Sequence, residues 1–248
     1  MSAALTIAKR EVFSYFVSPI AYVVSVVWLV WCGLQYYVLA GMYAGAPSLG
    51  ASGSPLSAFF GGSVLFFIPL LVFAPVLTMR LLAEERHTGT LEPLLTAPVT
   101  TLDVVLGKYL AAMVFWIALW VPTGIYVWQT SFFGSIDYGA VLASYVGVLG
   151  IGLYYMAIGL AMSALAKNQI VAALLTFMLL SGLFVGGLLS FIESFAASRD
   201  LFDYVSLWGH MQAFSKGIVD TRFLVFDASV AFLFVYLAYR ALEGRRWQ

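Results

Sequence analysis

The sequence predicts an all-helical integral membrane protein with six spanning helices. Of its 248 residues 62% are apolar and only 10% are charged, whereas a soluble domain carries about 25% charged residues. The apolar residues gather in windows long enough for a spanning helix, which needs about 20 of them. Lysine and arginine are also distributed unevenly between the connecting segments. We therefore expect residues 1–248 to form a single transmembrane domain.

Composition also excludes some functions. The formal net charge is zero, so bulk charge gives no indication of nucleic-acid binding. The single cysteine, Cys32, lies in an apolar run, can form no internal disulfide and is expected to pack inertly. A cleavable signal peptide is not expected, because Lys9-Arg10 is followed by a full-length span without a small-residue cleavage site.

The N-terminal segment mixes apolar side chains with Lys9, Arg10 and Glu11. This mixture is typical of a helix that lies in the membrane interface. Ser18-Pro19 should end that helix, because the residue before a proline avoids the helical region. The alternative is a disordered N-terminus, which the aromatic residues of the segment disfavour.

Six windows then qualify as spanning helices: 20–39, 59–77, 109–127, 141–165, 170–192 and 224–241. Pro69 and Pro75 each remove a backbone hydrogen bond from the second window and can bend it. The break at Lys167-Asn168-Gln169 is short, so the fourth and fifth spans should form a tight hairpin.

The distribution of lysine and arginine predicts the orientation, because cytoplasmic loops carry the excess of both residues. With six spans, the side that holds both termini carries nine of the twelve lysine and arginine residues: Lys9, Arg10, Arg80, Arg86, Lys108, Lys167, Arg240, Arg245 and Arg246. The other side carries three: Arg199, Lys216 and Arg222. Both termini are therefore expected in the cytoplasm, and the uncharged loop from Gly41 to Ser57 outside.

The connector between the second and third windows, residues 80–108, is the only long, densely charged stretch in the first half of the chain. Glu84 and Glu85 lie near the expected end of the second span, where acidic side chains oppose the helix macrodipole at a cost of up to about 1 kcal/mol. That cost predicts a cationic partner, either Arg86 or a protein surface. The alternative is a helix that continues in water to Thr88 with both glutamates solvated.

A short separate helix is expected within this connector. Gly89 breaks the preceding helix, Thr90 is an N-cap candidate, and Glu92 and Pro93 fit a first helical turn. Pro98 then stops the element.

The short helix carries an apolar face, because Leu91, Leu94 and Leu95 share one side at helical spacing. This face either packs on the protein's own interfacial helix or docks into a groove on a partner. Thr100-Thr-Leu-Asp103 next predicts a capping box that starts the run into the third span.

These residues resemble the cytoplasmic coupling segment of ABC-2-type transporter permeases. In that pattern an Arg/Glu-rich helix end leads into Gly-Thr-Leu-Glu, a leucine pair, a proline and then Gly-Lys, as in residues 80–108 here. Within the family, the chain most resembles the small permeases of gliding motility and copper-enzyme maturation. Ser18-Pro19 and Lys216-Gly217 fit the same layout, which covers nearly the whole chain.

The resemblance implies a bacterial inner-membrane permease that works as a dimer with a second copy or a paralogue. Separate cytoplasmic ATPase subunits would bind the ATP and Mg²⁺. The element at Thr90–Ala97 would be the coupling helix that enters a cleft of the ATPase. The coupling residues would be Glu84, Glu85, Arg86, Thr90, Leu91, Glu92, Leu94 and Leu95.

The chain itself is not expected to be an enzyme or to hold a cofactor. Gly107-Lys108 departs from the Walker pattern, because Leu102 stands five residues before Gly107 and Tyr109 follows Lys108. His87 and His210 are expected on opposite sides of the membrane in structural roles, and no metal-binding pattern such as His-Glu-x-x-His is present.

The predicted spans hold few charges, and charges within spans mark ion or proton paths. The first five windows contain none, and Asp227 lies about one turn from the outer end of the sixth, where we expect it to reach water. A proton-coupled carrier is therefore disfavoured. An uncharged interior favours a lipid-like, amphipathic or polymeric substrate over a small ion.

Small residues in two of the windows allow helices to approach closely. We expect these close contacts within one subunit in preference to a contact between two subunits of a dimer. The small residues are Gly147, Gly150, Gly152 and Gly159 in the fourth window and Gly182 and Gly186 in the fifth.

The outer segment 193–222 is too polar to span, but Leu207, Met211, Phe214 and Ile218 repeat at helical spacing. Gly217 is placed to end this helix. The resemblance implies an external, partly re-entrant helix above the translocation path. The alternative is an amphipathic helix on the outer leaflet.

The sequence therefore favours the permease subunit of an ABC-2 exporter. ATP-driven closure of the ATPases would move the second and third spans and open an outward path between two permease copies. The rival is a non-transporting transducer that drives a periplasmic or cell-surface machine, with periplasmic auxiliary proteins as further partners. The residues do not separate the two.

The charge distribution yields a direct test of orientation. A reporter that is active only in the cytoplasm should be active when fused after Gln248 and silent when inserted within 45–54, because positively charged loops stay inside. Reporter activity in membranes measures this, and the reverse pattern would contradict the topology.

Overall fold

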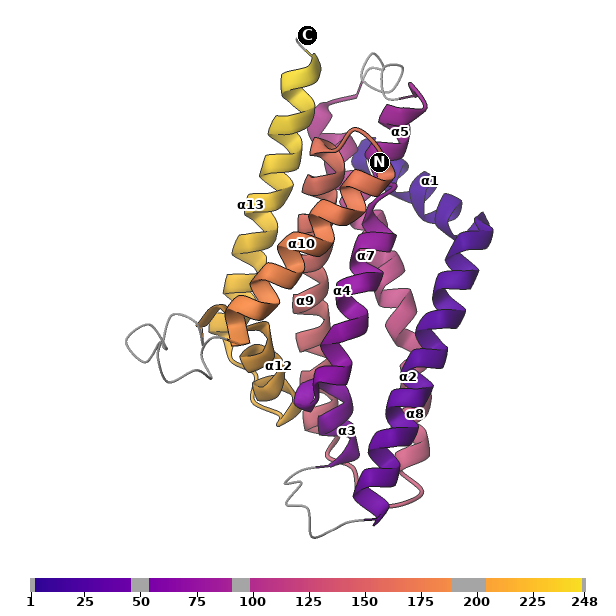
Figure 1. The fold of residues 1–248 in the computed structure, drawn as a ribbon, viewed down its shortest axis with the longest axis vertical. Coiled ribbons are helices and arrows are strands. Elements are labelled where there is room, and N and C mark those ends of the chain that lie inside the picture. The colour runs from indigo at the N-terminus through magenta and orange to yellow at the C-terminus, as the bar shows by residue number, and fades with distance from the viewer. Residues whose placement is uncertain (1–2, 46–53, 91–98, 189–203, 247–248) are drawn as a thin grey trace.

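The computed structural model describes residues 3–45, 54–90, 99–188 and 204–246, and every regular element in these ranges is a helix. Both chain ends lie toward the same end of an elongated bundle (Figure 1). The helices are α1 (Ala3–Val17), α2 (Pro19–Gly45), α3 (Pro55–Ser57), η1 (Ala58–Gly62), α4 (Val64–Thr78), α5 (Ala83–His87), α7 (Thr101–Trp120), η2 (Val121–Thr123), α8 (Gly124–Thr130), α9 (Tyr138–Leu165), α10 (Gln169–Leu188), α12 (Leu207–Ser215) and α13 (Thr221–Arg246).

Among the described residues, five continuous stretches are long and apolar enough to cross a membrane, and a bent pair of helices makes a sixth if the pair forms one span. The five are Pro19–Tyr43, Thr101–Thr130, Tyr138–Leu165, Gln169–Leu188 and Thr221–Gly244, and the pair is Pro55–Gly62 with Val64–Thr78. The all-helical membrane fold is confirmed. The third span starts at Thr101 rather than at Tyr109, so the prediction that the first five spans carry no charge is wrong: Lys108 lies inside this helix.

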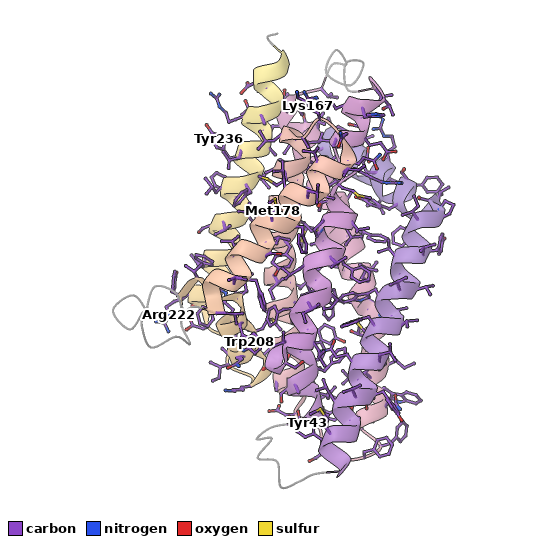
Figure 2. All side chains as sticks on the ribbon, in the orientation of Figure 1. Tyr43, Lys167, Met178, Trp208, Arg222 and Tyr236 are labelled. Carbon is purple, nitrogen blue, oxygen red and sulfur yellow. The ribbon has the colours of Figure 1, made fainter. Side chains whose placement is uncertain are left out.

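Helix α9 forms the centre of the bundle. Within its most apolar window 78% of the residues are buried, compared with 17% for α13. The outer helices turn large apolar side chains away from the bundle, for example Met178 of α10 and Tyr236 of α13 (Figure 2). Such an outward apolar surface suits contact with lipid.

The glycines of α9 let four other elements approach it closely. A Cβ at Gly147, Gly150, Gly152 or Gly159 would lie within 3 Å of side chains of α12, α13, α7 and α4, respectively. Packing within one subunit is therefore confirmed for the glycines of this helix. For Gly182 and Gly186 the same expectation is wrong, because a Cβ at either would meet no atom of the described residues within 4 Å.

The second span is broken near one end. Gly61 has φ +136°, and the helices on either side of the break meet at 42°. Only glycine adopts this φ readily, and a Cβ there would also lie 2.6 Å from the Cβ of Met211. The amide of Gln35 donates to the carbonyl of Phe59 at 3.0 Å, so α2 satisfies one backbone oxygen at the break.

The prolines predicted to bend the second span lie within one continuous helix, α4. Pro69 has no N–H to donate to the carbonyl of Leu65. The indole of Trp31 donates to that oxygen instead, at 3.3 Å. The sharp bend of the second span therefore lies at Gly61 rather than at the prolines. Trp31 of α2 replaces the hydrogen bond to Leu65 that Pro69 cannot donate.

Helix α1 confirms the N-terminal helix, and the disordered alternative is wrong. It packs along α7, where a Cβ at Gly107 would lie 2.8 Å from Cγ2 of Ile7. The hydroxyl of Tyr15 donates to the carbonyl of Leu77 at 3.0 Å, and its ring stacks on Phe115. These contacts attach α1 to the end of α4 and to the side of α7.

The glycine contacts yield a test of the packing. Gly159→Ala should lower the free energy of unfolding by about 1–3 kcal/mol, because its Cβ would overlap the β-branched side chain of Thr78. Gly182→Ala is the matched control, since its site is open. Thermal unfolding in detergent compares the two, and equal stability of both variants would contradict the close packing of α4 on α9.

Candidate functional site

The end of the bundle that holds both chain ends also holds a cluster of charged side chains on α1, α5, α7 and the turn before α5. We call this the charged end, defined by Glu11, Arg80, Glu84, Glu85, Arg86 and Lys108. Leu91, Glu92, Leu94 and Leu95 of the predicted coupling residues fall within 91–98, outside the described residues.

Helix α5 is a separate element, because the backbone turns at residues 79–82 between α4 and α5. Ser163 of α9 joins the two helices. Its hydroxyl oxygen accepts from the backbone N–H groups of Leu82 and Ala83, each at 3.0 Å, and donates to the carbonyl of Met79 at 3.2 Å. One side chain thus satisfies three backbone groups that the turn frees.

Lys108 lies at the centre of the charged end, with only 2% of its side chain exposed. Its Nζ lies 2.7 Å from Oε1 of Glu85 and 3.3 Å from Oε1 of Glu11. A buried ammonium is costly unless it is paired, so these contacts bind α5 and α1 to α7. Burial raises the pKa of Glu85, and the nearby Lys108 opposes that shift.

Two arginines complete the attachment of α5. Nη1 of Arg86 donates to the carbonyl of Ala166 at 2.8 Å, at the junction between α9 and α10. Arg80 lies 3.8 Å from Glu84, and both side chains are more than a third exposed, so this ion pair contributes little stability. Among the charged side chains of α5, Glu85 and Arg86 therefore fasten the helix, in addition to the hydrogen bond from Ala83 to Ser163.

Both sequence-based interpretations of Glu85 are wrong in part. Its partner is Lys108 rather than Arg86, and it is not solvated as the alternative supposed. The two glutamates lie in the first turn of α5 and not at the end of the second span. An acidic side chain in a first turn is favourable for the helix, so the expected macrodipole penalty does not arise.

The turn after α5 matches the predicted breaker. Gly89 has φ +72° directly after the helix, a conformation that favours glycine. The hydroxyls of Thr88 and Thr90 lie 2.9 Å apart. The predicted capping box of α7 is also confirmed: the hydroxyl of Thr100 accepts from the N–H of Asp103 at 3.1 Å, and the carboxylate accepts from the N–H of Thr100 at 3.3 Å.

A polar groove of about 660 Å³ opens at the charged end between α1, α5 and the start of α7. It reaches from the N-terminal helix to the turn after α5. Its lining residues are Arg10, Glu11, Ser14, Tyr15, Ser18, Arg80, Leu81, Glu84, Glu85, Thr88, Thr90 and Lys108. Glu84, Glu85 and Thr90 of the predicted coupling set therefore share one concave surface.

The helix predicted around Leu207, Met211 and Phe214 exists as α12, and Gly217, with φ +84°, follows its end. Leu207, Met211 and Phe214 are buried against α9, α10 and η1. The alternative of a helix resting on the outer leaflet is therefore wrong. Ile218 lies beyond the helix and is exposed.

Asp227 of α13 does not reach water as expected, because only 1% of its side chain is exposed. It lies beside His210 of α12, which is equally buried. Sequence reasoning also missed the buried position of Lys108 and the role of Ser163. The apolar run that follows Lys108 directly could have indicated that this lysine is buried. The sequence around Ser163 carries no pattern that indicates its hydrogen bonds to the turn before α5.

The fold is that of a multi-span helical membrane protein whose charged end is fastened by buried ion pairs and backbone hydrogen bonds. A family model described as ABC-2 family transporter protein matches residues 3–239, and the chain belongs to this family. It is therefore a membrane-spanning permease component of an ABC system, and the family implies a cytoplasmic ATPase as its partner. No curated protein matches the chain.

The ion pairs of Lys108 yield a stability test. Lys108→Met should lower the free energy of unfolding by about 2 kcal/mol or more, because it leaves Glu85 half-buried and unpaired. The double variant Lys108→Met with Glu85→Gln should recover part of that loss. Lys167→Met, which removes an exposed lysine at the same end (Figure 2), is the control. Thermal unfolding of all variants measures the effect, and a Lys108→Met protein as stable as the control would contradict a structural role for the pair.

Proposed function

We propose that this chain is the transmembrane subunit of an ABC exporter, with the charged end in the cytoplasm and residues 90–97 as the helix that docks into the ATPase. The observation that carries the proposal is the anchoring of α5. This helix precedes the docking segment and is fastened to two spans, α9 through Ser163 and α7 through Lys108, and to the junction of α9 with α10 through Arg86.

The contacts that anchor α5 define how a movement of the docking segment would be transmitted to the spanning helices. A displacement of residues 90–97 would act on α5 through the turn at Gly89 and on α7 through the capping box at Thr100. From α5 it would reach α9 through Ser163 and α7 again through Lys108. Because buried polar contacts are costly to break, these elements would move together.

The orientation follows from the nine lysine and arginine residues assigned to the side with both termini, against three on the other side. Location in the bacterial inner membrane and assembly with a second copy or a paralogue follow from the resemblance of residues 80–108 to ABC-2 permeases. The broad apolar faces of α10 and α13 favour a lipid-like, amphipathic or polymeric substrate that moves outward between two copies. ATP and Mg²⁺ would bind to the ATPase alone.

The alternative is a transducer that uses the same ATPase contact to drive a periplasmic or cell-surface machine. Its support is the resemblance of the charged connector to permeases of gliding motility. Purification from native membranes separates the two functions: an ATPase alone favours transport, while large periplasmic partners favour transduction.

The docking segment yields the test of the proposal. Leu94→Asp should release the ATPase while the permease still inserts, because burying a leucine contributes about 1.5–3 kcal/mol and an aspartate in its place would be desolvated. Gly134→Asp adds the same charge at an open position at the opposite end of the bundle and is the control. Co-purification from detergent measures the effect. A Leu94→Asp permease that keeps its ATPase at wild-type stoichiometry would show that this segment is not the docking helix.

A further inference from the structure

At the end of the bundle opposite the charged end, α2 and α8 line a groove of about 730 Å³. Tyr43, one of its lining residues, marks this end of the molecule in Figure 2. The rings of Tyr36 on α2 and Tyr126 on α8 stack with their centroids 5.0 Å apart and so join the two helices. The volume lies within the range of pockets that hold small organic ligands, about 300–1,000 Å³.

Aromatic side chains make up half of the groove lining, which contains no charged side chain among the described residues. The rings belong to Tyr36, Tyr37, Tyr43, Tyr126 and Phe133. Tyr37 and Phe133 are 77% and 82% exposed, so a ligand can reach their rings without any rearrangement of the bundle. The face of an aromatic ring carries negative partial charge, and a cation within about 6 Å of the ring centre is attracted to it.

Three hydroxyl groups of the groove have already donated their hydrogens within the protein. Thr130 donates its single hydrogen to the carbonyl of Tyr126 at 2.7 Å. The hydroxyl of Tyr36, which lies 2.9 Å from Oγ1 of Thr130, must therefore be the donor of that pair. Tyr126 donates to the carbonyl of Leu29 at 3.2 Å. These three oxygens consequently present only lone pairs to a ligand.

A smaller polar pocket of about 140 Å³ adjoins the groove, since Thr130 lines both. Its lining includes Asp137, Ser144 and Ser215. The two serine hydroxyls donate to backbone carbonyls at 2.7 and 3.0 Å and also leave only lone pairs. Asp137 adds an exposed carboxylate. Among the described residues, no lysine or arginine lines either the groove or the pocket.

The groove and the pocket are therefore complementary to positive charge. Ring faces, hydroxyl lone pairs and one carboxylate all attract a cation, and an anion would be repelled by each of them. A bare metal ion is a poor match, because it requires several oxygen ligands at short distance, whereas the larger cavity offers mainly ring surface. A cation with a large apolar body matches both the charge and the lining.

We propose that the groove between α2 and α8 binds a hydrophobic organic cation, with its apolar body against the aromatic side chains and its positive group toward Thr130 and Asp137. The site deepens the proposed function and rests on it for one point: with the charged end in the cytoplasm, the groove opens at the outer face of the membrane. An amphipathic cation is then the substrate class of the exporter.

Binding is tested on the purified full-length chain in neutral detergent, without the ATPase. Equilibrium dialysis measures the affinity for tetraphenylphosphonium and for tetraphenylborate, which has the same shape and the opposite charge. Micelles without protein correct for partitioning of both probes. The phosphonium should bind saturably, and the borate should bind at least about tenfold more weakly, because its charge would meet ring faces and a carboxylate. Equal affinity for the two probes would overturn the proposal.

Variants then locate the site. Tyr37→Leu combined with Phe133→Leu removes two exposed rings and should weaken phosphonium binding by about fivefold or more. Tyr37→Phe with Phe133→Tyr keeps both rings and should bind like the wild type. Phe132→Leu is the matched control, since it removes an exposed ring beside Phe133 that does not line the groove. Unchanged affinity in the leucine double variant would overturn the proposal.

The outcome is independent of the contact with the ATPase. Thermal unfolding shows whether each variant is folded, and if the leucine double variant is not, the comparison of the two probes on the wild type decides. A permease that retains its ATPase but binds no phosphonium would contradict this site and leave the proposed function intact. A Leu94→Asp permease that keeps both its ATPase and the phosphonium would contradict the docking segment and leave the groove intact.

Discussion

The interruption of the second span is the constraint on which both ends of this molecule depend. In an apolar environment each free backbone N–H or carbonyl must find a partner, and α4 ends in a turn at residues 79–82 at the charged end and in the break at Gly61 at the other. Ser163 satisfies the first interruption with three hydrogen bonds. Gln35 contributes to the second through the carbonyl of Phe59. A break in a spanning helix is thus stabilised by side chains of its neighbours.

The side-chain hydrogen bonds that replace missing helical ones also connect neighbouring helices to one another. Ser163 cannot satisfy the turn before α5 without fixing α5 to α9, and Lys108 cannot be buried without Glu85 and Glu11 nearby. The charged end is consequently part of the packed bundle rather than a loose extension of it. A permease that receives force from a separate ATPase requires such a connection, because a flexible joint would absorb the movement.

At the opposite end of the bundle, buried polar side chains of a different kind also join neighbouring helices. Gly61 allows α12 to approach the break, and the glycines of α9 let α12 and α13 lie against the central helix. His210 and Asp227 are then brought together in an enclosed pocket. Buried polar groups therefore join elements at both ends, through a lysine with two glutamates at one and through an acid–base pair at the other.

The fold class and the six spans could be predicted from the sequence, because hydropathy and length depend only on local composition. Gly89 and the capping box at Thr100 were predictable for a similar reason, since each acts within a few residues. The partners of Lys108 and Asp227 could not be predicted, because Glu85 and His210 reach them only through the tertiary arrangement.

Two further predictions failed for related physical reasons. A hydropathy window begins where charges end, so it excluded Lys108 from a helix that starts at Thr101. The glycines of α9 and those at 182 and 186 have the same local pattern, yet among the described residues only the former meet neighbouring helices. Spacing indicates that close approach is allowed, but the position of the helix within the bundle decides whether it occurs.

The hydrogen bonds of Arg86 and Ser163 would join α5 rigidly to the junction of α9 and α10, so that the helix transmits movement instead of absorbing it. The most direct measurement is the spin–spin distance between labels at His87→Cys and Lys167→Cys, two exposed positions, in a protein whose buried Cys32 is replaced by alanine. A rigid joint predicts one narrow distance distribution that stays unchanged when the ATPase and ATP are added, and that broadens in Ser163→Ala. A broad distribution in the parent protein, or a shift on addition of ATP, would show that the joint is not rigid.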